Sequence, residues 1–140
     1  MAIDLKVPHG TTAWFEMLGE VMCEAASRGG LSPDFNMSVV EPFTDGAQLP
    51  GGLVQGFRFD IIGGKPSFKI GVRPDERGDI TIFITAAASH KLNTLHATDP
   101  EYQTTLGNFL STGEMRVDGD PSQLGDWLHP VHDAVVDRTI

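Results

Sequence analysis

The sequence has little cysteine and little positive charge. Cys23 is its single cysteine, which excludes an internal disulfide and a thiolate metal cluster built from one chain. Lys and Arg number 10 against 19 Asp and Glu, and the formal net charge is -9. Because affinity for nucleic acid depends on basic side chains that neutralise phosphates, this balance argues against a nucleic-acid partner.

Long apolar runs and targeting signals are missing as well. No run approaches the roughly 18 apolar residues that a membrane span requires, so we expect no stable membrane insertion. The first residues, MAIDLKVPHG, lack the apolar core of a signal peptide, and the final DRTI matches no retention or peroxisomal signal. Together with the single cysteine, these features predict a cytoplasmic protein.

The sequence does contain strand patterns. Apolar and polar residues alternate around residues 35–39, 57–61, 68–72, 80–84 and 115–117, which is the period of a half-buried strand. The chain has no low-complexity linker and no repeat, so we expect one domain over residues 1–140 with an N-terminal arm over residues 1–10. The predicted class is α+β, an antiparallel sheet of about five strands with helices packed on its apolar face.

Helical spacing marks the segments that cover this sheet. A helix is predicted over residues 12–28, with Gly29 and Gly30 as its stop signal. Two helices separate the last two strands, and the second of these has Asp99 as N-cap and Pro100 in its first turn. A final helix over residues 120–137 contains Pro130, which predicts a bend or a split near that residue.

The opposite face of the predicted sheet is mostly polar, as expected for a solvated surface. Val40, Val54, Ile62 and Phe83 share this outward parity. They indicate, as an alternative, a homodimer formed through the outer face of the sheet.

The later half of the chain resembles the sterol carrier protein type-two family. The residues that carry this resemblance are Asp79, Thr81, Ile82, Ile84, Phe109, Gly113, Met115, Val117, Gly119 and Asp120. The resemblance implies an antiparallel sheet covered by helices on one face, with an apolar tunnel between them that holds a lipid-like ligand. The sequence departs from the family in the loop of residues 96–99, in Pro130 and in the missing peroxisomal signal.

The predicted function is noncatalytic binding or transfer of a lipid or another apolar small molecule. Such a tunnel needs mostly apolar walls and few polar anchors. The residues expected to line it are Phe57, Phe59, Phe68, Ile70, Ile82, Ile84, Leu92, Leu106, Phe109, Leu110, Trp127, Leu128 and Val131. The alternative is that these side chains fill a solid core.

Two other classes of function stay open. An isomerase or cyclase could use the same tunnel, with acid or base groups among His90, His96, Tyr102 and Asp60. A structural or interaction module would instead have an outward apolar patch and no ligand.

Metal and cofactor chemistry has weak support. His129 and His132 have helical i, i+3 spacing but no evident third ligand, so we predict no metal. Residues 51–56 and 63–67 are glycine-rich, but they lack the spacing of dinucleotide and phosphate-binding loops. We therefore expect no cofactor.

Overall fold

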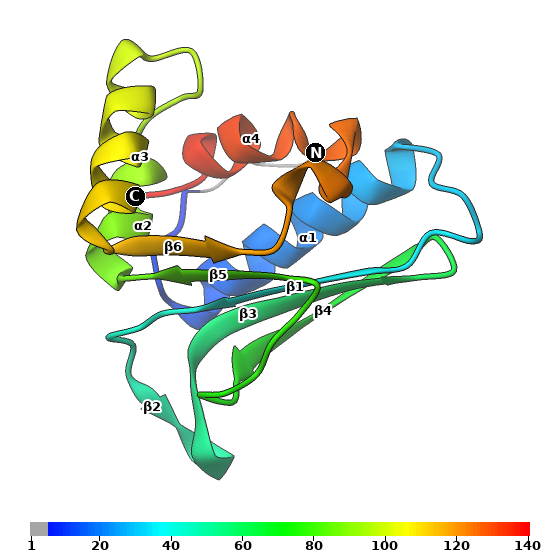
Figure 1. Cartoon of the computed structure of the whole chain (residues 1–140), viewed down its shortest axis with the longest axis horizontal. Coiled ribbons are helices and arrows are strands. Elements are labelled where there is room, and N and C mark those ends of the chain that lie inside the picture. The colour runs from blue at the N-terminus through cyan, green and yellow to red at the C-terminus, as the bar shows by residue number, and fades with distance from the viewer. Residues whose placement is uncertain (1–5) are drawn as a thin grey trace.

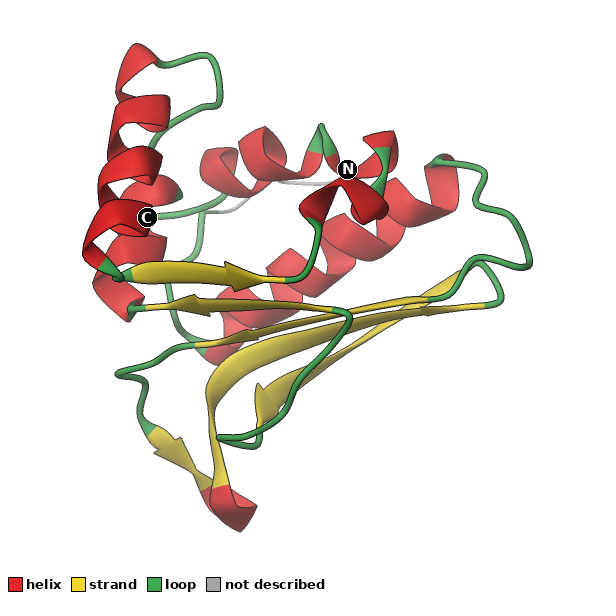
Figure 2. Ribbon diagram, viewed as in Figure 1, coloured by secondary structure: helices red, strands yellow, loops and turns green. Residues whose placement is uncertain are grey.

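The computed structural model describes residues 6–140, which form a sheet with helices on one of its faces (Figure 1, Figure 2). The strands are β1 (Met37–Pro42), β2 (Gln48–Leu49), β3 (Leu53–Ile62), β4 (Lys65–Val72), β5 (Ile80–Ile84) and β6 (Met115–Asp118). The helices are α1 (Thr12–Arg28), α2 (Ala86–Leu92), α3 (Pro100–Thr112) and α4 (Val131–Asp137). Figure 1 shows α1 and α4 above the sheet and α2 and α3 at one of its ends. The predicted α+β class, with helices on one face, is confirmed.

The sheet is mixed rather than wholly antiparallel. β3 pairs antiparallel with β1, β2 and β4, and β5 pairs antiparallel with β6. β1 and β5 are parallel, with Val39 opposite Ile80 and Val40 opposite Thr81. The connection after β4, residues 73–79, returns across the sheet, so β5 enters beside β1 in the same direction. This one pairing differs from the predicted antiparallel sheet.

The returning connection, residues 73–79, lies against the outer face of the sheet. Arg58 of β3 forms a 3.0 Å ion pair with Glu76 in this connection. Val40 on the same face is fully buried, whereas Ile62 is 69% exposed. Val40 and Ile62 therefore do not share an exposed patch, and a homodimer through this face stays a prediction.

The N-terminal segment packs against the C-terminal one. Residues 1–5 of the predicted arm lie outside the described residues. Val7 forms backbone hydrogen bonds with the last residues of the chain. The Val7 N–H donates to Arg138 O at 2.8 Å, and the Ile140 N–H donates to Val7 O at 2.9 Å. Trp14 of α1 donates its Nε1–H to Thr139 Oγ1 at 2.9 Å. These bonds fix α1 over the sheet beside α4.

Local signals account for the helix boundaries. The Thr11 side chain caps α1 by accepting from the Trp14 N–H, and Thr85 caps α2 in the same way through Ala88. Asp99 caps α3, as predicted, and Gly113 ends that helix with φ of 82°. Glycine favours this left-handed conformation because it has no Cβ.

The C-terminal segment is split, as Pro130 predicts. Residues 120–137 form two short 3-10 turns, η2 (Pro121–Leu124) and η3 (Asp126–Leu128), followed by α4. Gly125, with φ of 88°, separates the two turns, and Pro130 stands at the N-cap of α4. The segment therefore crosses the top of the sheet as three short pieces.

Candidate ligand-binding cavity

A cavity of about 240 Å³ lies between the sheet and the helices. Its lining comes from every helix and from β1, β3, β5 and β6. The residues are Trp14, Leu18, Met22, Val39, Glu41, Phe57, Ile82, Ile84, Ser89, Leu92, Asn93, Tyr102, Met115, Leu124, Leu128, Val131, His132 and Val135. Most of these side chains are apolar, so the cavity suits an apolar ligand.

The cavity contains some of the predicted tunnel residues and not others. Those that line it are Phe57, Ile82, Ile84, Leu92, Leu128 and Val131, and those that do not are Phe59, Phe68, Ile70, Leu106, Phe109, Leu110 and Trp127. Phe59 is fully buried and packs against Trp127, with 5.7 Å between ring centroids. Leu110 is 47% exposed. The structure therefore places the first set around this cavity and Phe59 in solid core, whereas Trp127 lines a separate hollow beside Gly29 of the α1 C-cap.

Of the four groups suggested for catalysis, one lines the cavity. Tyr102 of α3 does so, and burial together with nearby Asp133 raises the pKa of its phenol. His90 is exposed and contacts Ile140 O at 2.9 Å, and His96 is exposed and lies 2.7 Å from Asp137 Oδ1. Asp60 pairs with Arg58 through a 3.0 Å contact. His90, His96 and Asp60 do not line the cavity.

The most informative residue of the cavity, Glu41, was missed by the sequence prediction. Glu41 lies near the end of β1, where Met37 and Val39 face the core. Extending the period-2 pattern by one step places Glu41 on the same inward face. That alternation was the signal that could have found it, but the strand predicted over residues 35–39 stops short of this position.

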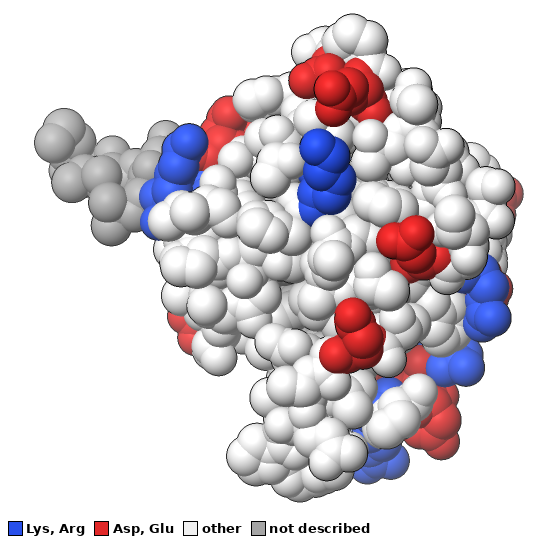
Figure 3. Space-filling view, turned by 90° about the vertical axis from the view of Figure 1, so that its left-hand side faces the viewer, with Lys and Arg blue, Asp and Glu red and all other residues white. Residues whose placement is uncertain are grey.

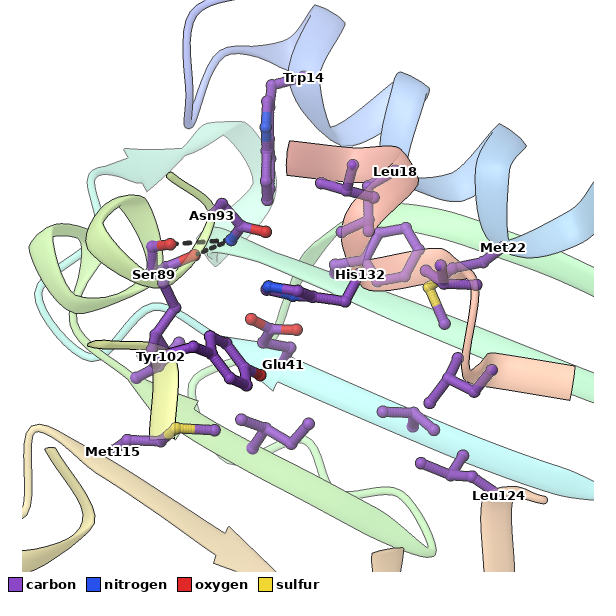
Figure 4. A pocket seen from close by; sticks show the side chains of 18 residues that line it. Trp14, Leu18, Met22, Glu41, Ser89, Asn93, Tyr102, Met115, Leu124 and His132 are labelled. Carbon is purple, nitrogen blue, oxygen red and sulfur yellow. Dashed lines mark hydrogen bonds between the residues drawn. The ribbon is translucent and has the colours of Figure 1, made fainter. Parts of the chain in front are cut away.

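The Glu41 carboxylate has no hydrogen-bond or ion-pair partner among the described residues. Burial raises its pKa from 4.5 to about 7. Glu41 is partly exposed, and its side chain lines the cavity and points into it (Figure 4). A charged side chain that is buried without a partner lowers the stability of the folded protein. Glu41 is therefore a candidate functional residue.

Other polar groups gather near Glu41. Figure 4 shows Tyr102, His132, Asn93 and Ser89 around it, whereas Leu18, Met22 and Leu124 lie away from this group. His132 Nε2 lies 2.7 Å from Leu95 O, and since a carbonyl cannot donate, Nε2 carries the proton. The rings of Tyr102 and His132 are 4.6 Å apart. The cavity therefore has one polar end and a larger apolar part.

A second layer supports the polar end. Ser89 is buried, and its Oγ lies 2.9 Å from His9 Nε2. Asn93 Nδ2 donates to Ser89 O at 2.8 Å. Burial, together with nearby His90, lowers the pKa of His9 to about 4, so His9 is neutral at pH 7. These bonds fix the α2 side of the cavity without adding charge to it.

Metal ligands do not converge within residues 6–140, where no three His, Cys, Asp or Glu side chains come together. The Nε2 atom of His129, an exposed residue, lies 3.9 Å from Asp126 Oδ1, and His132 is hydrogen-bonded to Leu95 O.

Among the helices of residues 6–140, none combines the length and the apolar character that crossing a membrane requires. Figure 3 shows the end of the molecule that carries α2 and α3, where charged side chains are few and scattered.

The fold can be compared with known proteins. No protein-family model matches the sequence, and no curated protein sequence matches it. A crystal structure of sterol carrier protein 2 is 12% identical, with a TM-score of 0.52, and the match covers 91% of this chain and 96% of that one.

Two further solved structures are similar. Sterol carrier protein 2 from Aedes aegypti, solved in complex with the C16 fatty acid palmitate, is 13% identical with a TM-score of 0.49, over 96% of this chain and 98% of that one. A conserved hypothetical protein from Thermus thermophilus, described as a possible sterol carrier protein, is 13% identical with a TM-score of 0.47, over 94% and 87%. The match to the crystal structure of sterol carrier protein 2 shows that this chain has the sterol carrier protein 2 fold, as the resemblance in its sequence predicts.

Proposed function

We propose that the protein binds a compact apolar molecule, such as a small lipid, in the cavity between sheet and helices and transfers it without chemical conversion. The observation that carries this proposal is the cavity itself, about 240 Å³ with mostly apolar walls. Pockets for drug-sized ligands span about 300–1,000 Å³, so this one suits a ligand below that size. The few polar side chains at one end would orient it.

Ligand binding can be tested by blocking the cavity. Ile82 of β5 lines it, whereas Ile62 at the end of β3 is 69% exposed and outside it. Ile82→Trp would fill the space, and Ile62→Trp is the matched control. We expect apolar ligands, measured by calorimetry, to bind the wild type and Ile62→Trp and to lose affinity for folded Ile82→Trp. Equal affinity in both variants would show that ligands bind elsewhere.

The natural ligand can be sought separately. Native mass spectra of protein purified from its own host, followed by denaturing extraction, would identify a molecule that copurifies. We expect an apolar molecule at near-stoichiometric occupancy. A water-soluble charged metabolite at that occupancy would contradict the proposal, because the cavity has mostly apolar walls.

A second candidate function rests on Glu41. A carboxylate with a pKa near 7 beside the Tyr102 hydroxyl suits proton transfer, as in an isomerase or cyclase acting on an apolar ketone. This alternative uses Glu41 in place of His90, His96 and Asp60. Wild type and Glu41→Gln can be compared for deuterium exchange at the carbons next to the carbonyl of 2-octanone in D₂O. Catalysed exchange that Glu41→Gln abolishes would favour the enzyme, and no exchange above background would favour the carrier.

A further inference from the structure

We propose that the polar end of the cavity selects its ligand by a hydroxyl group, with Glu41 accepting a hydrogen bond from a neutral apolar alcohol or phenol and rejecting an ionised carboxylate. This inference rests on the proposed function, because it names the ligand class of the same cavity. It is independent of whether the ligand is transferred or converted.

The first argument is the unused hydrogen-bonding capacity of Glu41. Its two carboxylate oxygens have no donor among the residues that the structure describes, and the side chain points into the cavity (Figure 4). A buried carboxylate without donors is destabilising, and a ligand hydroxyl placed against it would supply one. The group is also well positioned, because β1 lies between β3 and β5 in the sheet.

The second argument is the charge around the cavity. No Lys or Arg is among the described residues that line it, so no permanent cation awaits a ligand carboxylate. Two carboxylates in one apolar space repel each other unless one of them takes up a proton. A fatty acid head at this end would therefore face Glu41 without a permanently charged counter-ion.

The third argument concerns the other groups that face Glu41. From α3 comes the Tyr102 hydroxyl, and from α4 comes His132, whose Nε2–H is held by Leu95 O and whose Nδ1 is left as an acceptor when the ring is neutral. From α2 and its C-cap come Ser89 and Asn93, which carry no charge. The Glu41 oxygens and His132 Nδ1 are acceptors at this end, and the Tyr102 hydroxyl can accept or donate. A ligand hydroxyl, which can do both, therefore fits this end better than a group that can only accept.

The protonation of Glu41 gives the selection a pH dependence. Burial raises its pKa to about 7, so below that pH the neutral acid can donate to a ligand carboxylate. Above that pH the anion accepts from hydroxyls and repels carboxylates. The preference for an alcohol over the matching carboxylate should increase as the pH rises through 7.

The test uses 1-octanol and octanoate, which have the same chain length and differ in the head group. Dissociation constants are measured by calorimetry at pH 6 and pH 8.5, where free octanoate is ionised throughout. The variants are Glu41→Gln and, as the matched control, Glu16→Gln at an exposed position of α1. The indole N–H resonance of Trp14, which lines the cavity, reports whether the ligand is inside, and that of Trp127, which does not, is the internal reference.

We expect wild type and Glu16→Gln to bind octanol at least about tenfold more tightly than octanoate at pH 8.5, with a smaller ratio at pH 6. In Glu41→Gln the ratio should fall and lose its dependence on pH. A ratio that is the same in wild type and Glu41→Gln would overturn the hydroxyl selection while leaving the carrier proposal intact. Tighter binding of octylammonium than of octanol would also overturn it, since the preferred head would then be a cation. If no octyl ligand shifts the Trp14 resonance, the proposed function itself fails.

Discussion

Replacing Glu41 by Gln should stabilise the empty protein, and the gain should depend on pH. Gln keeps the size of the side chain and removes a charge that burial disfavours. The pKa of Glu41 is about 7 in the folded protein against 4.5 for an ordinary glutamate. At about 1.36 kcal/mol per pH unit, this difference corresponds to about 3 kcal/mol of unfolding free energy.

The sign follows from proton binding. Between pH 4.5 and 7 the folded protein holds a proton on Glu41 that the unfolded chain has released, so the wild type loses stability as the pH rises through this window. Below pH 4.5 the carboxyl is neutral in both states and costs nothing, and above pH 7 the loss is complete. Glu41→Gln has no such group. Its advantage over the wild type should therefore grow from near zero at pH 4.5 to about 3 kcal/mol at pH 8.

Urea unfolding followed by circular dichroism at pH 5, 6, 7 and 8 measures this difference. All other carboxylates are common to the wild type and Glu41→Gln. Subtracting their unfolding free energies at each pH therefore isolates the contribution of Glu41. Glu16→Gln, at an exposed position of α1, is the matched control, and its stability should stay close to that of the wild type. A Glu41→Gln difference that is constant from pH 5 to 8 would refute the reasoning, because it would mean that Glu41 titrates alike in the folded and unfolded states.

Three further changes test the packing of the fold by the same unfolding measurement. Gly19→Ala should destabilise it by about 1–3 kcal/mol, because the new Cβ would overlap the Phe68 ring, and an unchanged midpoint would contradict that contact. Gly107→Ala should stabilise it by about 0.5–1 kcal/mol, because this helix position is open and alanine favours helix, and a loss would show a hidden contact. Burial raises the pKa of Glu76, but hydrogen bonds from a backbone N–H and from Arg58 outweigh burial and leave the pKa below its ordinary value. Glu76→Gln should therefore cost about 1–2 kcal/mol at pH 7 and progressively less as the pH falls through the glutamate range, whereas a pH-independent cost would exclude the ion pair as the cause.

The sequence predicted the elements well because their signals are local. The alternation in residues 80–84 and the caps at Asp99 and Pro100 each depend on a few neighbouring residues, and the structure has β5 and the start of α3 at these positions. The parallel pairing of β1 with β5 was missed because it depends on the path of residues 73–79, and the pattern within one strand does not encode its neighbours.

The cavity was harder to predict than the face on which it lies. Apolar periodicity shows that Phe57 and Phe59 point inward, but it does not show which of them meets an empty volume and which meets another side chain. Phe59 packs against Trp127, whereas Phe57 reaches the cavity. That distinction depends on how far α1 and the split C-terminal segment stand from the sheet. It is a property of the assembled layers, so no local pattern contains it.

The energetic cost of leaving Glu41 unpaired is itself an argument for a ligand. Above pH 7 the charged, unpaired side chain costs about 3 kcal/mol. Small domains are stable by only about 5–15 kcal/mol in total. An apolar residue in place of Glu41 would remove this cost. A molecule with an apolar body and a hydroxyl head would reduce it as well, because its body fits the mostly apolar walls and its head donates a hydrogen bond to the carboxylate, so its binding would stabilise the complex.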